Sequence, residues 1–171
     1  MKIRIAINGF GRIGRNLFRL LLNHPQIEVV AINDIADTMT MAHLLKYDSI
    51  HGVLPLEVKA DEKGININGN HIRFFHEKSI ANLDWKSLDI DYVIESTGKY
   101  KTFDELNAHI LAGAKKVILS APSEVETIKT VVLGVNETIL DGSETIISNA
   151  SCTTNNAAPM IQIIDQLCGI E

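Results

Sequence analysis

The first 34 residues show the hydrophobic pattern of a strand, a helix and a second strand. Ile3, Ile5 and Ile7 alternate with polar or small residues, which predicts a strand. The apolar residues that follow recur about every 3.6 residues and predict a helix that ends before Pro25. A second apolar run at 27–32 predicts another strand. These elements form a βαβ unit, whose crossover is right-handed in nearly every known case.

The rest of the chain continues this pattern up to about residue 150. Two helices are predicted at 38–47 and 103–112, and two further parallel strands at 92–96 and 116–120. Short antiparallel strands are predicted at 53–58, 65–67 and 71–75, with an Asn-Gly hairpin turn before the last, and more strands at 130–135 and 145–147. The predicted fold is α/β: a doubly wound, mostly parallel sheet with helices on both faces and a small antiparallel hairpin insert.

A glycine-rich loop joins the first strand to the first helix. Gly9 suits a tight turn, Gly11 a close approach of backbone to a pyrophosphate, and Gly14 close packing of helix on strand. This spacing alone is a weak signal, but the strand before it and the helix after it strengthen it. Asp34 ends the second strand, twenty residues beyond Gly14, where an acid accepts hydrogen bonds from ribose hydroxyls and repels a 2′-phosphate. The sequence therefore predicts a Rossmann-type domain that prefers NAD to NADP, with a cap for the turn at 37–38 as the alternative role of Asp34.

Two more loops follow parallel strands at the carboxyl edge of the predicted sheet. Thr97 and Gly98 follow one strand, and Ser120 ends another. Ligands of open α/β sheets bind at this edge, so these residues are candidates for lining the cofactor site. Spacing alone leaves a simple turn equally open for each loop.

Residues 148–155 place a cysteine among small hydroxyl and amide residues at the start of an apolar helical pattern. The free N–H groups and the positive dipole end of a helix N-terminus favour the thiolate, so Cys152 is predicted to be a nucleophile. Pro159 lies beyond the first turn and is expected to cost a hydrogen bond or to kink the helix. Cys168 lies on the apolar face of the same pattern and is expected to be a buried structural residue.

Composition limits the classes of protein that remain. The chain has 171 residues, of which 46% are hydrophobic, enough for one core. It contains no apolar run that could span a bilayer and no signal-peptide pattern, so we expect a cytoplasmic protein without membrane contacts. The net charge of −5 argues against nucleic-acid binding. The two cysteines make no disulfide framework, and the histidines show no metal-like spacing, so no metal is expected.

Five segments together resemble the phosphorylating glyceraldehyde-3-phosphate dehydrogenases. They are 8–16 (NGFGRIGRN), 43–49 (HLLKYDS), 95–98 (ESTG), 113–117 (GAKKV) and 148–155 (SNASCTTN). The last is a highly specific signature, and the resemblance covers essentially the whole chain. It implies an NAD site made by Gly9, Phe10, Gly11, Arg12, Ile13, Gly14, Asp34, Lys78, Thr97, Gly98 and Ser120. It also implies that Ser151 and Thr153 line the site of the attacking phosphate.

The resemblance further implies a reaction and an organisation of the whole protein. Cys152 would attack the aldehyde of glyceraldehyde 3-phosphate, and inorganic phosphate would release 1,3-bisphosphoglycerate from the resulting thioester. The family's general base is a histidine of the substrate domain, and no histidine follows His109 here. We therefore expect an NAD-binding domain at 1–150, then a nucleophile-bearing helix at 151–171 that begins a substrate domain absent from this chain. The family implies a glycolytic homotetramer for the full-length protein, whereas the 171-residue chain alone is expected to bind NAD without turnover.

Two alternatives stay open beside this interpretation. Erythrose-4-phosphate dehydrogenase shares the cysteine chemistry, and the residues that would separate the two substrates are not in this chain. A stand-alone NAD-binding module, in which Cys152 senses redox state, is the second alternative. Asn156 occupies a position where many family members carry a second cysteine, which argues against disulfide-based redox behaviour of that pair.

Overall fold

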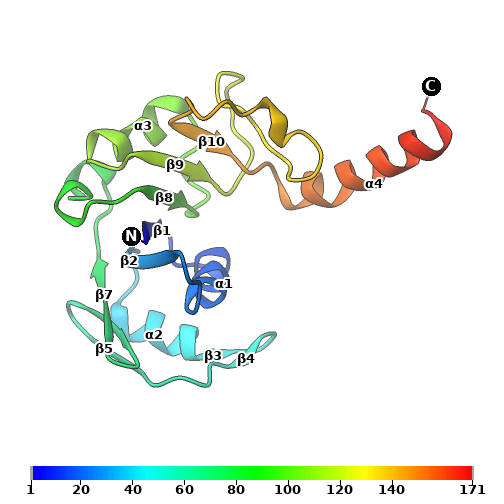
Figure 1. Cartoon of the computed structure of the whole chain (residues 1–171). Coiled ribbons are helices and arrows are strands. Elements are labelled where there is room, and N and C mark those ends of the chain that lie inside the picture. The colour runs from blue at the N-terminus through cyan, green and yellow to red at the C-terminus, as the bar shows by residue number, and fades with distance from the viewer. Residues whose placement is uncertain (1, 171) are drawn as a thin grey trace.

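A computed structural model describes residues 2–170 and shows one eight-stranded sheet with helices on both faces (Figure 1). The parallel strands are β1 (Ile3–Asn8), β2 (Ile27–Asn33), β7 (Asn70–Phe75), β8 (Tyr92–Glu95), β9 (Lys116–Leu119) and β10 (Ile146–Ser148). The helices are α1 (Arg12–Leu21), α2 (Thr38–Lys46), α3 (Phe103–Leu111) and α4 (Cys152–Cys168). Short 3₁₀ turns lie at Ile80–Asn82, Lys86–Leu88 and Glu137–Ile139. The predicted α/β class is therefore confirmed.

Alternation along the strands divides the core into two halves, one on each face of the sheet. Ile5 and Ile7 point to the face covered by α1 and α2, where Phe18 and Leu45 complete a buried cluster. Ala6 points to the opposite face, where Val93, Val117 and Leu106 of α3 belong to a second cluster. A strand segment that is buried on both faces must be apolar, as Ile5, Ala6 and Ile7 are in the middle of the central strand β1.

The order of the strands places a topological switch point between β1 and β8. The sheet runs β10-β9-β8-β1-β2-β7-β6-β5, where β6 is Gly64–Ile67 and β5 is Val58–Asp61. The chain therefore first builds outward from β1 through β2 and later returns to the other side of β1. Ligands of such sheets bind at the carboxyl ends of the two strands that flank this reversal. The residues that follow β1 and β8 are therefore brought together.

The antiparallel hairpin continues the main sheet. Strands β5 (Val58–Asp61) and β6 (Gly64–Ile67) pair antiparallel with each other, and β6 pairs antiparallel with β7, which itself lies parallel to β2. Asn68 and Gly69 both adopt positive φ angles (49° and 90°), as the predicted Asn-Gly turn requires. A separate two-stranded sheet joins β3 (Tyr47–Asp48) and β4 (Gly52–Val53).

The strand predicted at 53–58 is wrong. Only Val53 and Val58 belong to strands, β4 and β5, and the residues between them follow an irregular path. Pro55 has no N–H to donate, and the amine of Lys46 donates to the carbonyl oxygens of Leu54 (2.8 Å) and Leu56 (2.6 Å). A side chain therefore satisfies the backbone groups that a neighbouring strand would otherwise pair.

The strand predicted at 130–135 is also wrong, since only Thr130 forms a single bridge, to Ser148. The side chain of Asn136 makes the hydrogen bonds that a neighbouring strand would otherwise make with this segment. Its Oδ1 accepts from the N–H of Val132 (2.7 Å), and its Nδ2 donates to the carbonyl of Thr130 (3.0 Å). The following Gly134 has a φ of +83°, which turns the chain away from the sheet.

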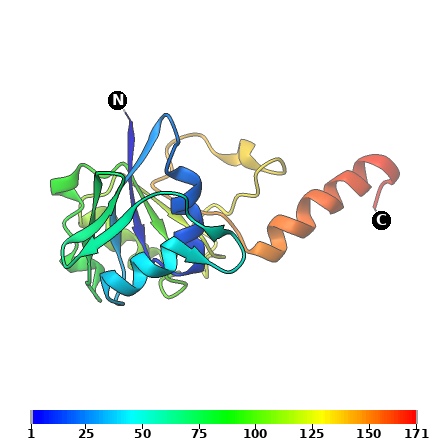
Figure 2. The ribbon, with the colours of Figure 1, turned by 90° about the horizontal axis from the view of Figure 1, so that it is seen from below.

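Helix α4 projects away from the sheet, as both views show (Figures 1 and 2). None of its residues is buried in the described part of the chain, and Met160, Ile161, Ile164 and Leu167 are more than half exposed. The prediction that Cys168 is buried is wrong, since its thiol is exposed. The reason is that the apolar face of α4, on which Cys168 lies, packs against no core in residues 2–170. Pro159 lies inside this helix, as the sequence predicted.

Candidate active site

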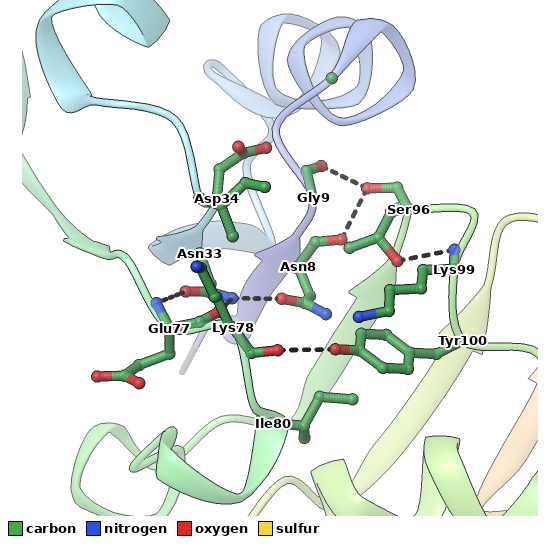
Figure 3. A pocket seen from close by; sticks show the side chains of 13 residues that line it. Asn8, Gly9, Asn33, Asp34, Glu77, Lys78, Ile80, Ser96, Lys99 and Tyr100 are labelled. Carbon is green, nitrogen blue, oxygen red and sulfur yellow. Dashed lines mark hydrogen bonds between the residues drawn. The ribbon is translucent and has the colours of Figure 1, made fainter.

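A cavity of about 420 Å³ opens at the switch point between β1 and β8 (Figure 3). Its walls come from the ends of β1, β2 and β8 and from the segment that follows β7. The residues that line it are Asn8, Gly9, Gly11, Asn33, Asp34, Ile35, Glu77, Lys78, Ile80, Ser96, Thr97, Lys99 and Tyr100. The cavity thus brings the glycine loop, the acid that ends β2 and the predicted loop at Thr97 into one site.

The glycines of the loop have distinct structural roles. Gly9 has a φ of +92°, and a Cβ added there would lie 2.5 Å from the backbone nitrogen of Thr97. A Cβ on Gly14 would lie 2.2 Å from the carbonyl oxygen of Gly9, so this glycine lets α1 pack on β1. A Cβ on Gly11 would meet nothing within 4 Å, because this position faces open space in the cavity wall. The first two roles match the predicted turn at Gly9 and the predicted close packing at Gly14, and the open space at Gly11 leaves room for the predicted approach of a ligand.

The N-terminus of α1 offers backbone donors to an anion. Gly11 is the N-cap, and among residues 2–170 no side chain caps this end and no acid lies in its first turn. Arg12 and Ile13, the first two residues of the helix, are exposed. Free N–H groups and the positive end of the helix dipole make such a terminus a site for phosphate. The residues present therefore fit the pyrophosphate of a dinucleotide.

The carboxylate of Asp34 is held in place by two backbone donors. Its Oδ2 accepts from the N–H of Phe10 (2.7 Å), and its Oδ1 accepts from the N–H of Ala36 (2.9 Å). Each oxygen keeps a further lone pair for a hydroxyl. Asp34 does brace its own turn, but the cap of α2 is Asp37, whose side chain accepts from the N–H of Thr40 (2.8 Å). Asp34 therefore remains able to receive a ribose.

The other predicted cofactor residues lie in different surroundings. The side chain of Phe10 is fully buried against Phe18 and Phe74, so only its backbone faces the loop. Lys78 lines the cavity, and its carbonyl accepts from the hydroxyl of Tyr100 (2.8 Å). Gly98 is exposed and has a φ of +72°. Ser120 is not among the residues that line the cavity, although its N–H donates to the carbonyl of Glu95 in the neighbouring strand (2.9 Å).

The site also contains residues that sequence reasoning did not select. Asn8 and Asn33 end β1 and β2, and both side chains are buried beneath the cavity. Ser96 and Glu95 stand at the end of β8, and Glu95 is fully buried. The signal that pointed to them is a polar residue at the carboxyl end of each of three apolar strands. Arg15 supports the loop by donating to the carbonyl of Phe10 (2.8 Å), and burial lowers the pKa of its guanidinium from the ordinary value.

The candidate nucleophile lies at a sharp turn between β10 and α4. Ala150 is buried and has a φ of +57°, a strained conformation for a residue with a Cβ. This turn makes Cys152 the first residue of α4, where its thiol is exposed. Since β10, β9, β8 and β1 are parallel neighbours, Cys152 follows a strand at the same edge of the sheet as the cavity. Cys152 does not itself line the cavity.

Hydroxyl groups surround the N-terminus of α4. Ser151 is the N-cap, and its Oγ accepts from the N–H of Thr154 (3.0 Å). The same Oγ lies within hydrogen-bonding distance of the hydroxyls of Thr153 (2.8 Å) and Thr154 (2.7 Å). The hydroxyls of Ser151 and Thr153 thus lie beside Cys152 at the start of α4.

The fold and the site define a Rossmann-type dinucleotide-binding domain that is followed by a cysteine at a helix N-terminus. Residues 3–103 match the family model described as glyceraldehyde 3-phosphate dehydrogenase, NAD binding domain. This match covers more than half of the chain, and the chain belongs to the glyceraldehyde-3-phosphate dehydrogenase family. Its N-terminal part is the NAD-binding domain of that family.

Curated relatives agree with the family model. The chain is 50% identical over 169 residues to a glyceraldehyde-3-phosphate dehydrogenase of Thermotoga maritima, and this match covers 98% of the chain and 50% of the relative. It is 49% identical over 168 residues to the enzyme of Mycoplasma pneumoniae, with the same two shares. It is 49% identical over 172 residues to glyceraldehyde-3-phosphate dehydrogenase 2 of Bacillus subtilis, covering 100% of the chain and 50% of the relative. The chain therefore spans about half the length of the curated relatives it matches.

Within residues 2–170, no helix is long and apolar enough to cross a membrane. No group of three or more His, Cys, Asp or Glu side chains in this part of the chain could hold a metal ion.

Proposed function

We propose that this chain supplies the cofactor site and the nucleophile of a phosphorylating glyceraldehyde-3-phosphate dehydrogenase. The reaction converts glyceraldehyde 3-phosphate, NAD and inorganic phosphate to 1,3-bisphosphoglycerate and NADH in glycolysis. The observation that carries this proposal is the turn at Ala150, which presents Cys152 at the N-terminus of α4 on the same sheet edge as the cofactor cavity. We also propose domain limits of 1–150 for cofactor binding and 151–171 for the start of a substrate domain, and the turn at Ala150 supports this boundary.

The thiolate of Cys152 attacks the aldehyde carbon and forms a hemithioacetal. NAD, when bound, supplies the acceptor for the hydride that this carbon must lose. The product is a thioester on Sγ, which retains the energy of the oxidation for the attack of phosphate. We assign that phosphate to the hydroxyls of Ser151 and Thr153, which flank Cys152 and lie 2.8 Å from each other. The proton of the hemithioacetal hydroxyl goes to a general base, a role that we assign to none of the residues named above.

The residues of the cavity hold the cofactor in the following way. The N-terminus of α1, with Gly11, Arg12 and Ile13, takes the pyrophosphate, and Asp34 takes the adenosine ribose. Lys78 and Thr97 line the cavity on opposite walls, and the exposed Gly98 follows Thr97 in its loop. Ser120 follows β9, which lies between β8 and β10 in the sheet. It is therefore one strand away from β10, which leads to Cys152, and two strands away from β1, which leads to the glycine loop.

Acyl transfer tests the role of Cys152 without a hydride acceptor or a general base. Acetyl phosphate is an acyl phosphate like the proposed product, so the thiolate is expected to take its acetyl group and release inorganic phosphate. Intact-mass and peptide analysis of the 171-residue chain should find a hydroxylamine-labile thioester on Cys152, and the Cys152→Ser variant should form none. Equal acylation of Cys152 and Cys168, which is also exposed, would contradict the proposal.

The chain by itself is expected to bind NAD but not to turn over glyceraldehyde 3-phosphate. Robust turnover by 171 residues would show that the proton acceptor lies within them and would contradict the division of roles given above. The names of the relatives favour glyceraldehyde 3-phosphate over erythrose 4-phosphate as the substrate of the whole protein. The same membership supports a cytoplasmic homotetramer for the full-length protein.

A further inference from the structure

A row of hydrogen-bonded polar side chains is buried beneath the cofactor cavity. Asn33, Asn8, Glu95 and His109 are each at most 4% exposed, and the row ends at the fully buried Trp85. Nδ2 of Asn33 donates to Oδ1 of Asn8 (2.7 Å), and Nδ2 of Asn8 donates to Oε2 of Glu95 (2.5 Å). The row crosses three neighbouring strands, β2, β1 and β8, and reaches α3.

The chemistry of the end groups determines the direction of every bond in the row. An indole N–H can only donate, so Nδ1 of His109 accepts from Nε1 of Trp85 (3.0 Å). The ring proton of His109 is therefore on Nε2, which donates to Oε2 of Glu95 (3.1 Å). At the other end, Asn33 donates to the carbonyl of Glu77 (3.0 Å) and accepts from its N–H (2.8 Å). Since no member can be reversed without placing two donors face to face, the row has a single arrangement.

Both walls of the cavity are attached to this row. Oε1 of Glu95 accepts from the N–H of Thr97 (2.8 Å) and also from its hydroxyl. The hydroxyl oxygen accepts in turn from the N–H of Lys99 (3.1 Å). Both donors of Thr97 are thus directed to Glu95 and away from a ligand. On the opposite wall, Asn33 holds the backbone of Glu77, next to the predicted cofactor residue Lys78.

We propose that Glu95 is a positioning residue for the cofactor. Its carboxylate accepts from four donors and holds the Thr97 loop against the glycine turn, so that the cavity is formed before NAD arrives. The closeness of the two loops supports this role, since a Cβ on Gly9 would lie only 2.5 Å from the nitrogen of Thr97. Thr97 then contributes to NAD binding through the position of its loop, because its hydroxyl donates to Glu95. The inference rests on the proposed NAD site. It adds that the affinity of this site for NAD depends on a loop that Glu95 holds in place before NAD binds.

The test begins with Glu95→Gln in the 171-residue chain. Glutamine keeps the shape of the side chain, but its NH₂ group must face either Thr97 or the pair formed by Asn8 and His109, all of which donate there. Calorimetric titration with NAD is expected to show a loss of affinity of about tenfold or more, because charge-assisted bonds that order the loop are lost. The matched control is Leu106→Ala on α3, which opens a cavity in the core outside the row. It should lower the unfolding midpoint and leave the affinity for NAD unchanged.

Substitutions at the exposed Thr97 test the same contact from its other side, and the single variants do so without any change at Glu95. Thr97→Val removes the hydroxyl with little change in shape and is expected to weaken NAD binding, and Thr97→Ser should recover most of that loss. Glu95→Gln added to Thr97→Val should cost less than it does in the unmodified chain, because both changes remove the same contact. Full additivity, or unchanged binding by Thr97→Val, would overturn the inference.

Amide exchange separates this inference from the proposed function. Exchange of the Thr97 N–H, measured without cofactor, should be faster in Glu95→Gln than in the unmodified chain and unchanged in Leu106→Ala. An unmodified chain that does not bind NAD would contradict the proposed function, and the exchange rates would still test the positioning of the loop. An unmodified chain that binds NAD no better than Glu95→Gln would overturn the positioning role alone.

Discussion

The hydroxyl of Ser96 lies 2.7 Å from the carbonyl oxygen of Gly9 and donates to it. The N–H of Ser96 also donates to the carbonyl of Asn8 (2.8 Å), so the loop after β8 is attached to the loop after β1 at two points. A glycine is needed at position 9 for two reasons, its φ of +92° and the backbone of Thr97 beside it. The turn therefore depends on a contact between segments 87 residues apart in the sequence.

The glycines of the loop should separate folding from binding. Gly11→Ala places a methyl group in open space of the cavity wall, at a φ of −69° that alanine adopts easily. The stability of the chain should change by less than about 1 kcal/mol, because the freedom that the unfolded state loses is offset by the poorer N-cap that alanine makes. The affinity for NAD should fall about tenfold or more, because the backbone can no longer approach the pyrophosphate. Chemical denaturation and calorimetric titration with NAD measure the two effects.

Gly9→Ala is the matched comparison. A Cβ there meets the backbone of Thr97 at 2.5 Å in a conformation that alanine disfavours, so this variant should lose both stability and affinity. An alanine at position 11 that binds NAD as tightly as glycine would show that the pyrophosphate does not lie against this residue.

Asp34 should determine the choice between NAD and NADP. The two backbone N–H groups that hold its carboxylate leave the oxygens open toward the cavity, where they would accept ribose hydroxyls and repel a 2′-phosphate. The unmodified chain should bind NAD more tightly than NADP, and Asp34→Ala should reduce the difference. Asp37→Ala, which removes only the cap of α2, is the control and should keep the preference. Equal affinity of the unmodified chain for both cofactors would contradict the role of Asp34.

Local patterns were sufficient to predict the parallel half of the fold. The alternation of Ile3, Ile5 and Ile7 and the glycines after them are decided by neighbours in the sequence, and the structure places β1, the turn and α1 where they were expected. Thr102 and Glu105 likewise form a capping box at the start of α3. Such signals need no knowledge of the remainder of the chain.

The two segments that were wrongly predicted to be strands have their backbone groups bonded by side chains from other parts of the chain. Lys46 reaches the carbonyls of Leu54 and Leu56, and Asn136 takes the bonds of Thr130 and Val132. β-Propensity in these segments is real, but tertiary contacts override it. Cys168 was misplaced for a related reason, since an apolar helical face does not reveal whether anything covers it.

The buried row beneath the cavity was not predicted at all. His109 has no metal-like spacing and lies in a helical pattern, so it was expected to be structural. Its partners Glu95 and Trp85 lie 14 and 24 residues away, on different elements, and no periodicity joins the three positions. A polar residue at the end of an apolar strand, such as Asn8, was the available clue, and it gains meaning only once the strand order is known.

Stability should fall at acidic pH through Glu144. A hydrogen bond from Lys129, together with backbone N–H donors, lowers the pKa of Glu144 from 4.5 to about 2. Because the folded pKa lies below the unfolded one, this stabilisation is fully present above pH 4.5 and is lost as the pH falls to about 2. Urea unfolding across this range should show a shallower decline in Glu144→Gln than in the unmodified chain. Glu62→Gln, in the exposed turn between β5 and β6, is the control and should keep the full decline.

The two cysteines offer an internal comparison for the role of the helix terminus. Cys152 is the first residue of α4 and Cys168 the last, and both thiols are exposed, so accessibility does not separate them. The helix dipole stabilises a thiolate at the N-terminus and destabilises one at the C-terminus, by roughly 0.3–1 kcal/mol at each end. Iodoacetamide at neutral pH should therefore label Cys152 about fivefold faster than Cys168. Peptide mapping after partial labelling measures the ratio, with Cys168→Ala confirming the rate at Cys152 alone. Preferential labelling of Cys168 would show that the terminus of α4 does not activate the proposed nucleophile.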